Sequence, residues 1–129
     1  RGYRQTGIFK PLFVKAKHTF CVDHHISNIG FAEVNHIVPE ASSTSELVYG
    51  LLEEEKISKN VAEALYLGIV HDTGVFQYSC AGPKTFRVAA KLLEKGIDAP
   101  KIIEETFYAK ILRTESCNGA CIDGKVSCF

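Results

Sequence analysis

An aspartate followed by two histidines stands directly after a short apolar run, and this junction limits the possible folds more than any other feature of the chain. Residues 20–22 favour a buried strand, so the triplet Asp23-His24-His25 is expected where that strand ends. Neutral imidazole binds transition metals, and a neighbouring carboxylate can orient the ring and raise its basicity. The triplet therefore predicts a site for a divalent metal and a phosphate at the end of a strand.

A second polar cluster follows another apolar stretch. Asp72 comes after the apolar run of residues 64–70 and precedes Thr73 and Gly74. By itself Asp-Thr-Gly is ordinary turn chemistry, and a single histidine on a turn is usually structural. Together, the two clusters predict a shared metal site.

The remaining patterns alternate between strand and helix. Residues 19–22 and 31–38 fit strands, the second near a sheet edge because Pro39 closes it. Four helices should follow, their starts marked by a capping box at residues 43–46, by Ser58, by Pro83 and by Asp98. This order predicts an α/β fold: an incomplete three-layer sandwich with a mainly parallel sheet and helices on its faces.

Each expected helix carries an apolar stripe that should face the core. The residues predicted to be buried are, helix by helix, Leu47, Val48, Leu51 and Leu52; Val61, Leu65 and Ile69; Phe86, Ala89, Ala90 and Leu93; and Ile102, Ile103 and Phe107.

Composition narrows the class of protein. With 129 residues and 46% apolar content, the chain can form one domain with a real core. Its 15 basic and 15 acidic residues cancel, so no overall charge attracts nucleic acid or a membrane. No apolar stretch is long enough to cross a bilayer, and no signal peptide is recognisable. The five irregularly spaced cysteines are expected to be incidental thiols in a reducing cytoplasm.

Three segments in order carry a family resemblance. Val22-Asp23-His24-His25 and Gly68-Ile69-Val70-His71-Asp72-Thr73-Gly74 resemble the third and fourth motifs of the DHH phosphoesterase superfamily. Ala41-Ser42-Ser43-Thr44-Ser45-Glu46 and Phe76 resemble its bacterial nanoRNase/pAp phosphatase branch. The resemblance implies hydrolysis of short RNA oligonucleotides or of 3′-phosphoadenosine 5′-phosphate. A type II inorganic pyrophosphatase, a cyclic-dinucleotide phosphodiesterase and a non-catalytic binding or dimerisation module are the alternatives.

The resemblance also implies roles for individual residues. In this superfamily two Mn²⁺ ions are held between an N-terminal Asp-rich motif, a bridging Asp, the Asp-His-His motif and a later Asp. His24 and Asp72 would each ligate a metal, so they should face each other across a shallow pocket, about 4–6 Å apart. His25 and Asp23 would be the catalytic residues, with His25 touching the scissile phosphate and Asp23 orienting a histidine. The Ser42 and Ser43 hydroxyls are expected chiefly to cap a helix, with phosphate binding near that helix start as the second reading.

The resemblance covers only part of what the superfamily requires. No aspartate precedes Asp23, and residues 1–22 contain no acidic residue, so at most one ion and little or no activity are expected of this chain. Because it begins at Arg1, we expect a piece of a longer protein, one that could be a homodimer. The expected organisation is an unassigned segment 1–12, a partial DHH domain 13–110, and an irregular or frame-shifted tail 111–129.

Overall fold

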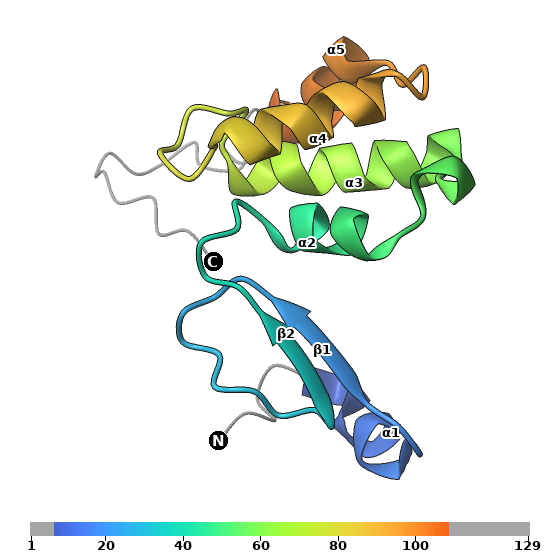
Figure 1. The fold of residues 1–129 in the computed structure, drawn as a ribbon, viewed down its shortest axis with the longest axis vertical. Helices are drawn as coiled ribbons and strands as arrows, with labels where there is room; N and C mark the ends of the chain where they lie inside the picture. Colours follow the sequence, from blue (N-terminus) through green and yellow to red (C-terminus); the bar gives the residue numbers. More distant parts are fainter. Residues whose placement is uncertain (1–6, 109–129) are drawn as a thin grey trace, which may run out of the picture.

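The computed structural model describes residues 7–108 (Figure 1), and the predicted tail 111–129 lies outside them. The helices and strands, in chain order, are α1 (Lys10–Lys15), β1 (Phe20–Asp23), β2 (Val34–Ile37), α2 (Thr44–Leu51), the 3-10 turn η2 (Glu54–Lys56), α3 (Lys59–Asp72), α4 (Pro83–Leu93), α5 (Ala99–Ile102) and the π-helical stretch η3 (Ile103–Tyr108). In this part of the chain, no helix has both the length and the apolar character needed to cross a bilayer.

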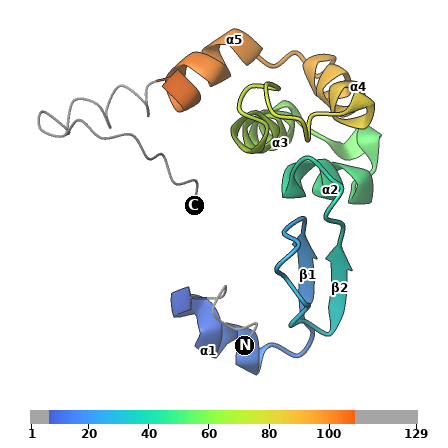
Figure 2. The same ribbon diagram turned by 90° about the vertical axis from the view of Figure 1, so that its left-hand side faces the viewer.

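The two strands pair in parallel, with Phe20 opposite Val34 and Asp23 opposite Ile37. Residues 24–33 return the chain from the end of β1 to the start of β2. Figures 1 and 2 show α2 at the carboxyl ends of both strands, with α3 and α4 beyond it, and α1 near the opposite end of the sheet. The predicted α/β class with a parallel sheet is confirmed, and the described residues contribute two strands to it.

The helix starts agree with their sequence signals. Ser43 and Ser58 accept hydrogen bonds from the backbone N–H groups of Glu46 and Val61, at 3.1 and 3.4 Å. Asp98 caps α5 in the same way, and Pro83 occupies the first turn of α4. Helix α1 was not expected from the sequence, and it spans the boundary drawn between residues 12 and 13.

Helix α3 lies at the centre of the helical layer in Figure 1, and its buried side chains form the middle of the core. Gly68 allows α2 to approach α3 closely, because a Cβ at this position would stand 2.0 Å from the Ser45 hydroxyl oxygen. The core consists of Ile57, Ala62, Leu65, Tyr66, Ile69, Val70, Val88, Ala89, Leu92, Ile97 and Ala99.

Of the four residues predicted to be buried on α4, Ala89 is buried, but the rest of the predicted face is displaced by one position. Its buried residues are Thr85, Val88, Ala89 and Leu92, whereas Phe86, Ala90 and Leu93 are exposed. The observed and the predicted residues both have the spacing of one helix face. The sequence alone favours the predicted face because it begins with the aromatic residue Phe86. Thr85 is buried instead because its hydroxyl donates to a carboxylate on α2. The expected burial of Val61, Leu51 and Leu52 is also wrong, since all three are exposed.

That carboxylate belongs to Glu46, which is almost fully buried. Its Oε2 accepts hydrogen bonds from the hydroxyls of Ser42 at 2.6 Å and Thr85 at 2.8 Å, and Lys84 Nζ lies 3.4 Å from its Oε1. The predicted capping box is therefore only half formed: the Glu46 N–H reaches Ser43, while the Glu46 side chain binds Ser42 and Thr85. Glu46 thus joins α2 to α4.

Three consecutive residues with left-handed backbone follow α3. Gly74, Val75 and Phe76 have φ angles of +55°, +56° and +62°, a conformation that costs residues with a side chain about 1 kcal/mol or more. Buried Thr73 supports the turn, since its hydroxyl donates to the Ile69 carbonyl at 2.6 Å and accepts from the Phe76 N–H at 3.0 Å. The turn fixes the end of α3, where Asp72 is the last residue.

Gly74→Ala should destabilise the protein by more than about 1 kcal/mol, because the new Cβ would sit in left-handed backbone and 2.5 Å from the Tyr78 ring. Gly50→Ala is the matched control. Gly50 lies in α2 with nothing within 4 Å of a new Cβ, so the change should be neutral or stabilising by up to about 1 kcal/mol. Urea-unfolding midpoints measure both, and equal midpoints would contradict the role given to the turn.

Acid should weaken the fold through Glu46. Burial alone would raise the pKa of Glu46, but the hydrogen bonds from Ser42 and Thr85 and the charge of Lys84 outweigh it, so the pKa lies below its ordinary value. A carboxyl group with a lowered folded-state pKa stabilises the protein above its unfolded pKa, about 4.3 for glutamate, and this stability is lost as the pH falls further.

The urea midpoint should therefore fall as the pH is lowered from about 5 towards 3. Glu46→Gln removes the titrating group and should make this decline shallower, although it lowers stability at pH 7. The same pH slope in the variant and the native chain would rule out Glu46 as a source of the acid sensitivity.

Candidate functional site

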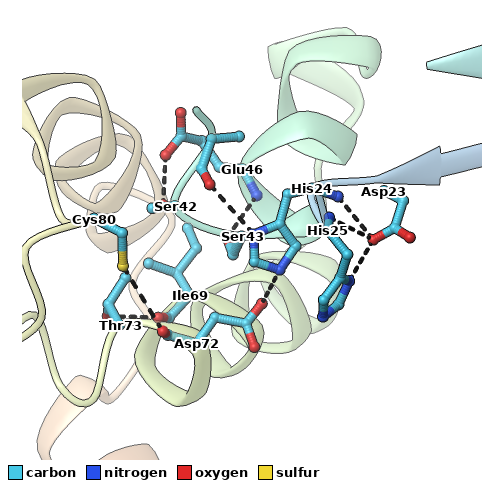
Figure 3. Close-up of polar contacts among 11 residues, drawn as sticks. Asp23, His24, His25, Ser42, Ser43, Glu46, Ile69, Asp72, Thr73 and Cys80 are labelled. Carbon is cyan, nitrogen blue, oxygen red and sulfur yellow. Dashed lines mark hydrogen bonds and ion pairs between the residues drawn. The ribbon is translucent and has the colours of Figure 1, made fainter. Parts of the chain in front are cut away.

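The structure brings His24 and Asp72 together, as predicted from the sequence. His24 follows the last residue of β1, and Asp72 ends α3, so the two side chains come from different layers of the molecule. His24 Nε2 lies 3.5 Å from Asp72 Oδ2, which is closer than the 4–6 Å expected (Figure 3). The His24 side chain is 19% exposed and that of Asp72 is 41% exposed, so the meeting point is accessible from solvent.

The other ring nitrogen of His24 contacts the backbone. Its Nδ1 lies 3.3 Å from the carbonyl oxygen of Ala41, just before α2. A carbonyl oxygen only accepts hydrogen bonds, so this bond requires a proton on Nδ1. In the neutral ring Nε2 then carries the lone pair, and this atom faces Asp72.

Asp23 turns away from Asp72 and organises the loop that follows β1. Its Oδ1 accepts hydrogen bonds from the N–H of His24 at 2.8 Å, the N–H of His25 at 3.2 Å and His25 Nδ1 at 2.7 Å, as Figure 3 shows. Its Oδ2 accepts from the Asn28 amide at 2.6 Å. Asp23 is thus a partner of His25, in agreement with the orienting role expected of it.

These hydrogen bonds keep Asp23 ionised. Burial acts to raise the pKa of Asp23, but the bonds from His25, Asn28 and the two backbone N–H groups outweigh it and lower the pKa to about 2. A carboxyl group with so low a pKa does not accept a proton at neutral pH. Asp23 is therefore a carboxylate that can hold His25 in place.

His25 is the exposed member of the triplet, with 65% of its side chain accessible. Its ring centroid lies 4.7 Å from that of His24, at an interplanar angle of 55°. Because Nδ1 donates to Asp23, Nε2 is the nitrogen that remains for a substrate. The structure places this ring beside the His24–Asp72 pair.

Ser42 and Ser43 are both buried and hydrogen-bonded. Ser42 donates to the Glu46 carboxylate, and Ser43 accepts from the Glu46 N–H. These contacts favour the helix-start role over phosphate binding for both hydroxyls.

Sequence reasoning missed three groups that shape the site. Asn28 is a buried amide on the loop after β1. Its position among apolar residues is the only sequence signal that could have indicated its burial. The Ala41 carbonyl is a backbone group, which a side-chain motif cannot show. Cys80 lies with its sulfur 3.9 Å from the Asp72 carbonyl oxygen, brought there by the turn after α3.

The spacing of His24 and Asp72 suits two ligands of one cation. Ligand atoms with bonds of about 2.1 Å stand about 3.0 Å apart at a right angle and about 3.4 Å apart at the tetrahedral angle. The observed 3.5 Å lies just above that range. Between residues 7 and 108, no group of three or more histidine, cysteine, aspartate or glutamate side chains could hold an ion. The described residues thus offer two ligands, fewer than the four to six that a bound metal takes.

Comparisons with known proteins identify relatives of the chain. The chain is 35% identical over 99 residues to the probable bifunctional oligoribonuclease and PAP phosphatase NrnA of Streptococcus mutans, which is 74% of this chain and 32% of that protein. It is 37% identical over 126 residues to the cyclic-di-AMP phosphodiesterase GdpP of Geobacillus thermodenitrificans, which is 90% of this chain and 19% of that protein.

A solved structure resembles the fold as well. The crystal structure of an exopolyphosphatase-related protein from Bacteroides fragilis superposes with a TM-score of 0.76 at 30% identity, covering 82% of this chain and 33% of that one. The chain therefore spans about a third or less of the length of the proteins it matches here.

The family itself is identified by a match that contains the main site segment. The model of the DHH family, N-terminal domain, matches residues 8–69, which include both strands, the Asp23-His24-His25 triplet and α2. Asp72 follows three residues after the matched range, on the same helix. The two relatives and the solved structure extend the similarity over 74% to 90% of the chain. The chain belongs to the DHH family.

Proposed function

We propose that this chain forms part of a metal-dependent phosphoester hydrolase that acts on short RNA oligonucleotides or on 3′-phosphoadenosine 5′-phosphate. One observation carries the proposal: His24 Nε2 and Asp72 Oδ2, from separate elements, lie 3.5 Å apart with the exposed His25 ring beside them. The naming of the Streptococcus mutans relative as an oligoribonuclease and PAP phosphatase supports the choice of substrates.

In this proposal His24 Nε2 and Asp72 Oδ2 are two of the ligands of a Mn²⁺ ion. Imidazole with carboxylate suits Mn²⁺, which would supply an activated water and neutralise phosphate charge when bound. With two ligands among the described residues, we expect one weakly held ion here and two in whole members of the family.

His25 handles the substrate in this scheme. Its Nδ1 is fixed by Asp23, so the ring keeps one orientation while Nε2 remains available. When both of its ring nitrogens carry a proton, an imidazole held in this way can donate a hydrogen bond from Nε2 to a phosphate oxygen, or transfer that proton to a leaving oxygen. Asp23 contributes by holding the ring through its hydrogen bond to Nδ1.

A second candidate is a cyclic-dinucleotide phosphodiesterase. It is favoured by the similarity to the cyclic-di-AMP phosphodiesterase of Geobacillus thermodenitrificans, which extends over 90% of the chain. Both candidates hydrolyse a phosphoester, so the His24–Asp72 pair serves either one. Substrate preference separates them.

Mn²⁺ binding tests the ligand assignment. Added in less than stoichiometric amount, Mn²⁺ should broaden the NMR signals of His24 and Asp72 first, because its unpaired electrons relax nearby nuclei. His24→Ala and Asp72→Ala should each weaken Mn²⁺ binding by about tenfold or more, since each removes a direct ligand and even outer partners contribute about 10- to 100-fold.

The matched control is His18→Ala. This histidine is exposed, pairs with Glu33 and lies outside the site. It should leave Mn²⁺ affinity unchanged. Equal affinity in native, His24→Ala and His18→Ala chains of the same helical content would show that His24 is not a ligand.

Turnover tests the reaction. The purified chain, in excess over substrate and with Mn²⁺, should slowly cleave 3′-phosphoadenosine 5′-phosphate and an RNA dinucleotide. His25→Ala should reduce the rate by about 100-fold, the usual contribution of a group that transfers a proton. Mn²⁺ affinity should not change, and His18→Ala should match the native chain. Faster cleavage of cyclic di-AMP would favour the second candidate.

A further inference from the structure

A buried polar cluster links α4 to the His24 ring through the segment before α2. The cluster consists of Ser42, Ser43, Glu46 and Thr85, all almost fully buried. Every described buried side-chain nitrogen or oxygen has a hydrogen-bond partner, so no buried polar side-chain atom of this cluster is left unpaired. Thr85 lies 39 residues from its partner Glu46, which makes the cluster a tertiary contact rather than only a helix cap.

A series of contacts leads from Thr85 through Glu46 and Ser42 to the Ala41 carbonyl. Thr85 and Ser42 both donate to Glu46 Oε2, at 2.8 and 2.6 Å. The carbonyl of Ala41 belongs to the same planar peptide unit as the nitrogen and Cα of Ser42, so fixing Ser42 also fixes the direction of that carbonyl. On its other side the Ala41 N–H donates to the Val38 carbonyl at 3.1 Å. The Ala41 carbonyl is therefore held from both sides where it meets His24 Nδ1 at 3.3 Å.

We propose that Thr85 and Glu46 are positioning residues of the site: through Ser42 they hold the Ala41 carbonyl, which accepts a hydrogen bond from His24 Nδ1 and keeps Nε2 directed at Asp72. The importance of this for metal binding rests on the proposed function, in which Nε2 is the ligand atom. The tautomer itself does not depend on that function.

Binding of a metal through His24 Nε2 requires that this nitrogen carry no proton. An imidazole that carries its proton on Nε2 has no lone pair there and cannot bind a metal through that atom. A backbone carbonyl at Nδ1 is a partner that selects the required tautomer and ring orientation. If the carbonyl rotates away, both tautomers and other ring orientations become available, and Nε2 no longer faces Asp72 in a fixed way.

The position of Thr85 supports a specific role. It opens the buried face of α4, where an apolar side chain would pack without needing a partner. Glu46 brings a carboxylate into the same place, and burying a carboxylate is unfavourable unless donors surround it. A purely structural link between α2 and α4 would be served equally well by apolar contacts.

The tautomer can be observed directly. Long-range ¹H–¹⁵N spectra of the metal-free chain, at a pH where histidine is neutral, distinguish a protonated from an unprotonated ring nitrogen. In the native chain His24 should show a protonated Nδ1. Thr85→Val keeps the size of the side chain but removes the hydroxyl, and it should shift His24 towards a mixture of tautomers and weaken Mn²⁺ binding by about tenfold.

Three variants separate positioning from stability. Thr85→Ser keeps the hydroxyl and should retain the native tautomer and Mn²⁺ affinity. Val88→Ala opens a cavity on the same buried face of α4, and Thr106→Val removes a threonine hydroxyl that bonds to the Ile102 carbonyl. Both should leave the His24 spectrum unchanged, even where Val88→Ala lowers the urea midpoint.

The outcomes are distinct. A native His24 spectrum in Thr85→Val, or equal changes in Thr85→Val and Thr85→Ser, would overturn the proposal. If Thr85→Val does not fold, Ser42→Ala breaks the same link one bond closer to Ala41 and must shift the tautomer for the proposal to hold. A shifted tautomer in a chain whose Mn²⁺ affinity is indifferent to His24→Ala would support the positioning role and overturn the metal role instead.

Discussion

The buried carboxylate of Glu46 is the interaction on which the arrangement around the site depends. A charge in this position is stable only with donors around it, and Ser42, Thr85 and Lys84 provide them. These partners come from the segment before α2 and from the first turn of α4, so the need to satisfy one carboxylate fixes how three parts of the chain meet. The strand end joins them through the hydrogen bond from His24 to Ala41.

The site is made of two halves that are supported independently. His24 is held from the strand side by the Ala41 carbonyl, while Asp72 is held from the helix side by the left-handed turn around Gly74. The close approach of α2 and α3 at Gly68 sets the distance between the halves. His24 and Asp72 are far apart in the sequence, so their 3.5 Å separation results from the packing of the helices.

Local chemistry explains what the sequence predicted well. Ser43, Ser58 and Asp98 begin helices because each side chain accepts a hydrogen bond from an N–H three residues on, and this requires no tertiary partner. The buried face of α4 could not be predicted, because burial of Thr85 over Phe86 depends on a carboxylate 39 residues away. The Asp-His-His and Asp-Thr-Gly motifs correctly predicted that His24 meets Asp72, but no side-chain pattern shows a backbone carbonyl such as that of Ala41.

The three residues of the Asp23-His24-His25 triplet differ in exposure according to their distance from the sheet. Asp23 still pairs with Ile37 in the sheet, so it is the most rigidly held and the least exposed, and its hydrogen bonds fix the backbone of the two residues that follow. His24 lies just beyond the sheet, shielded enough to keep one ring orientation and open enough to meet Asp72. His25 lies furthest out, and exposure of its ring is what a group that must reach a substrate needs. Exposure thus increases along three consecutive residues, from a carboxylate whose backbone still pairs in the sheet to an imidazole that is open to solvent.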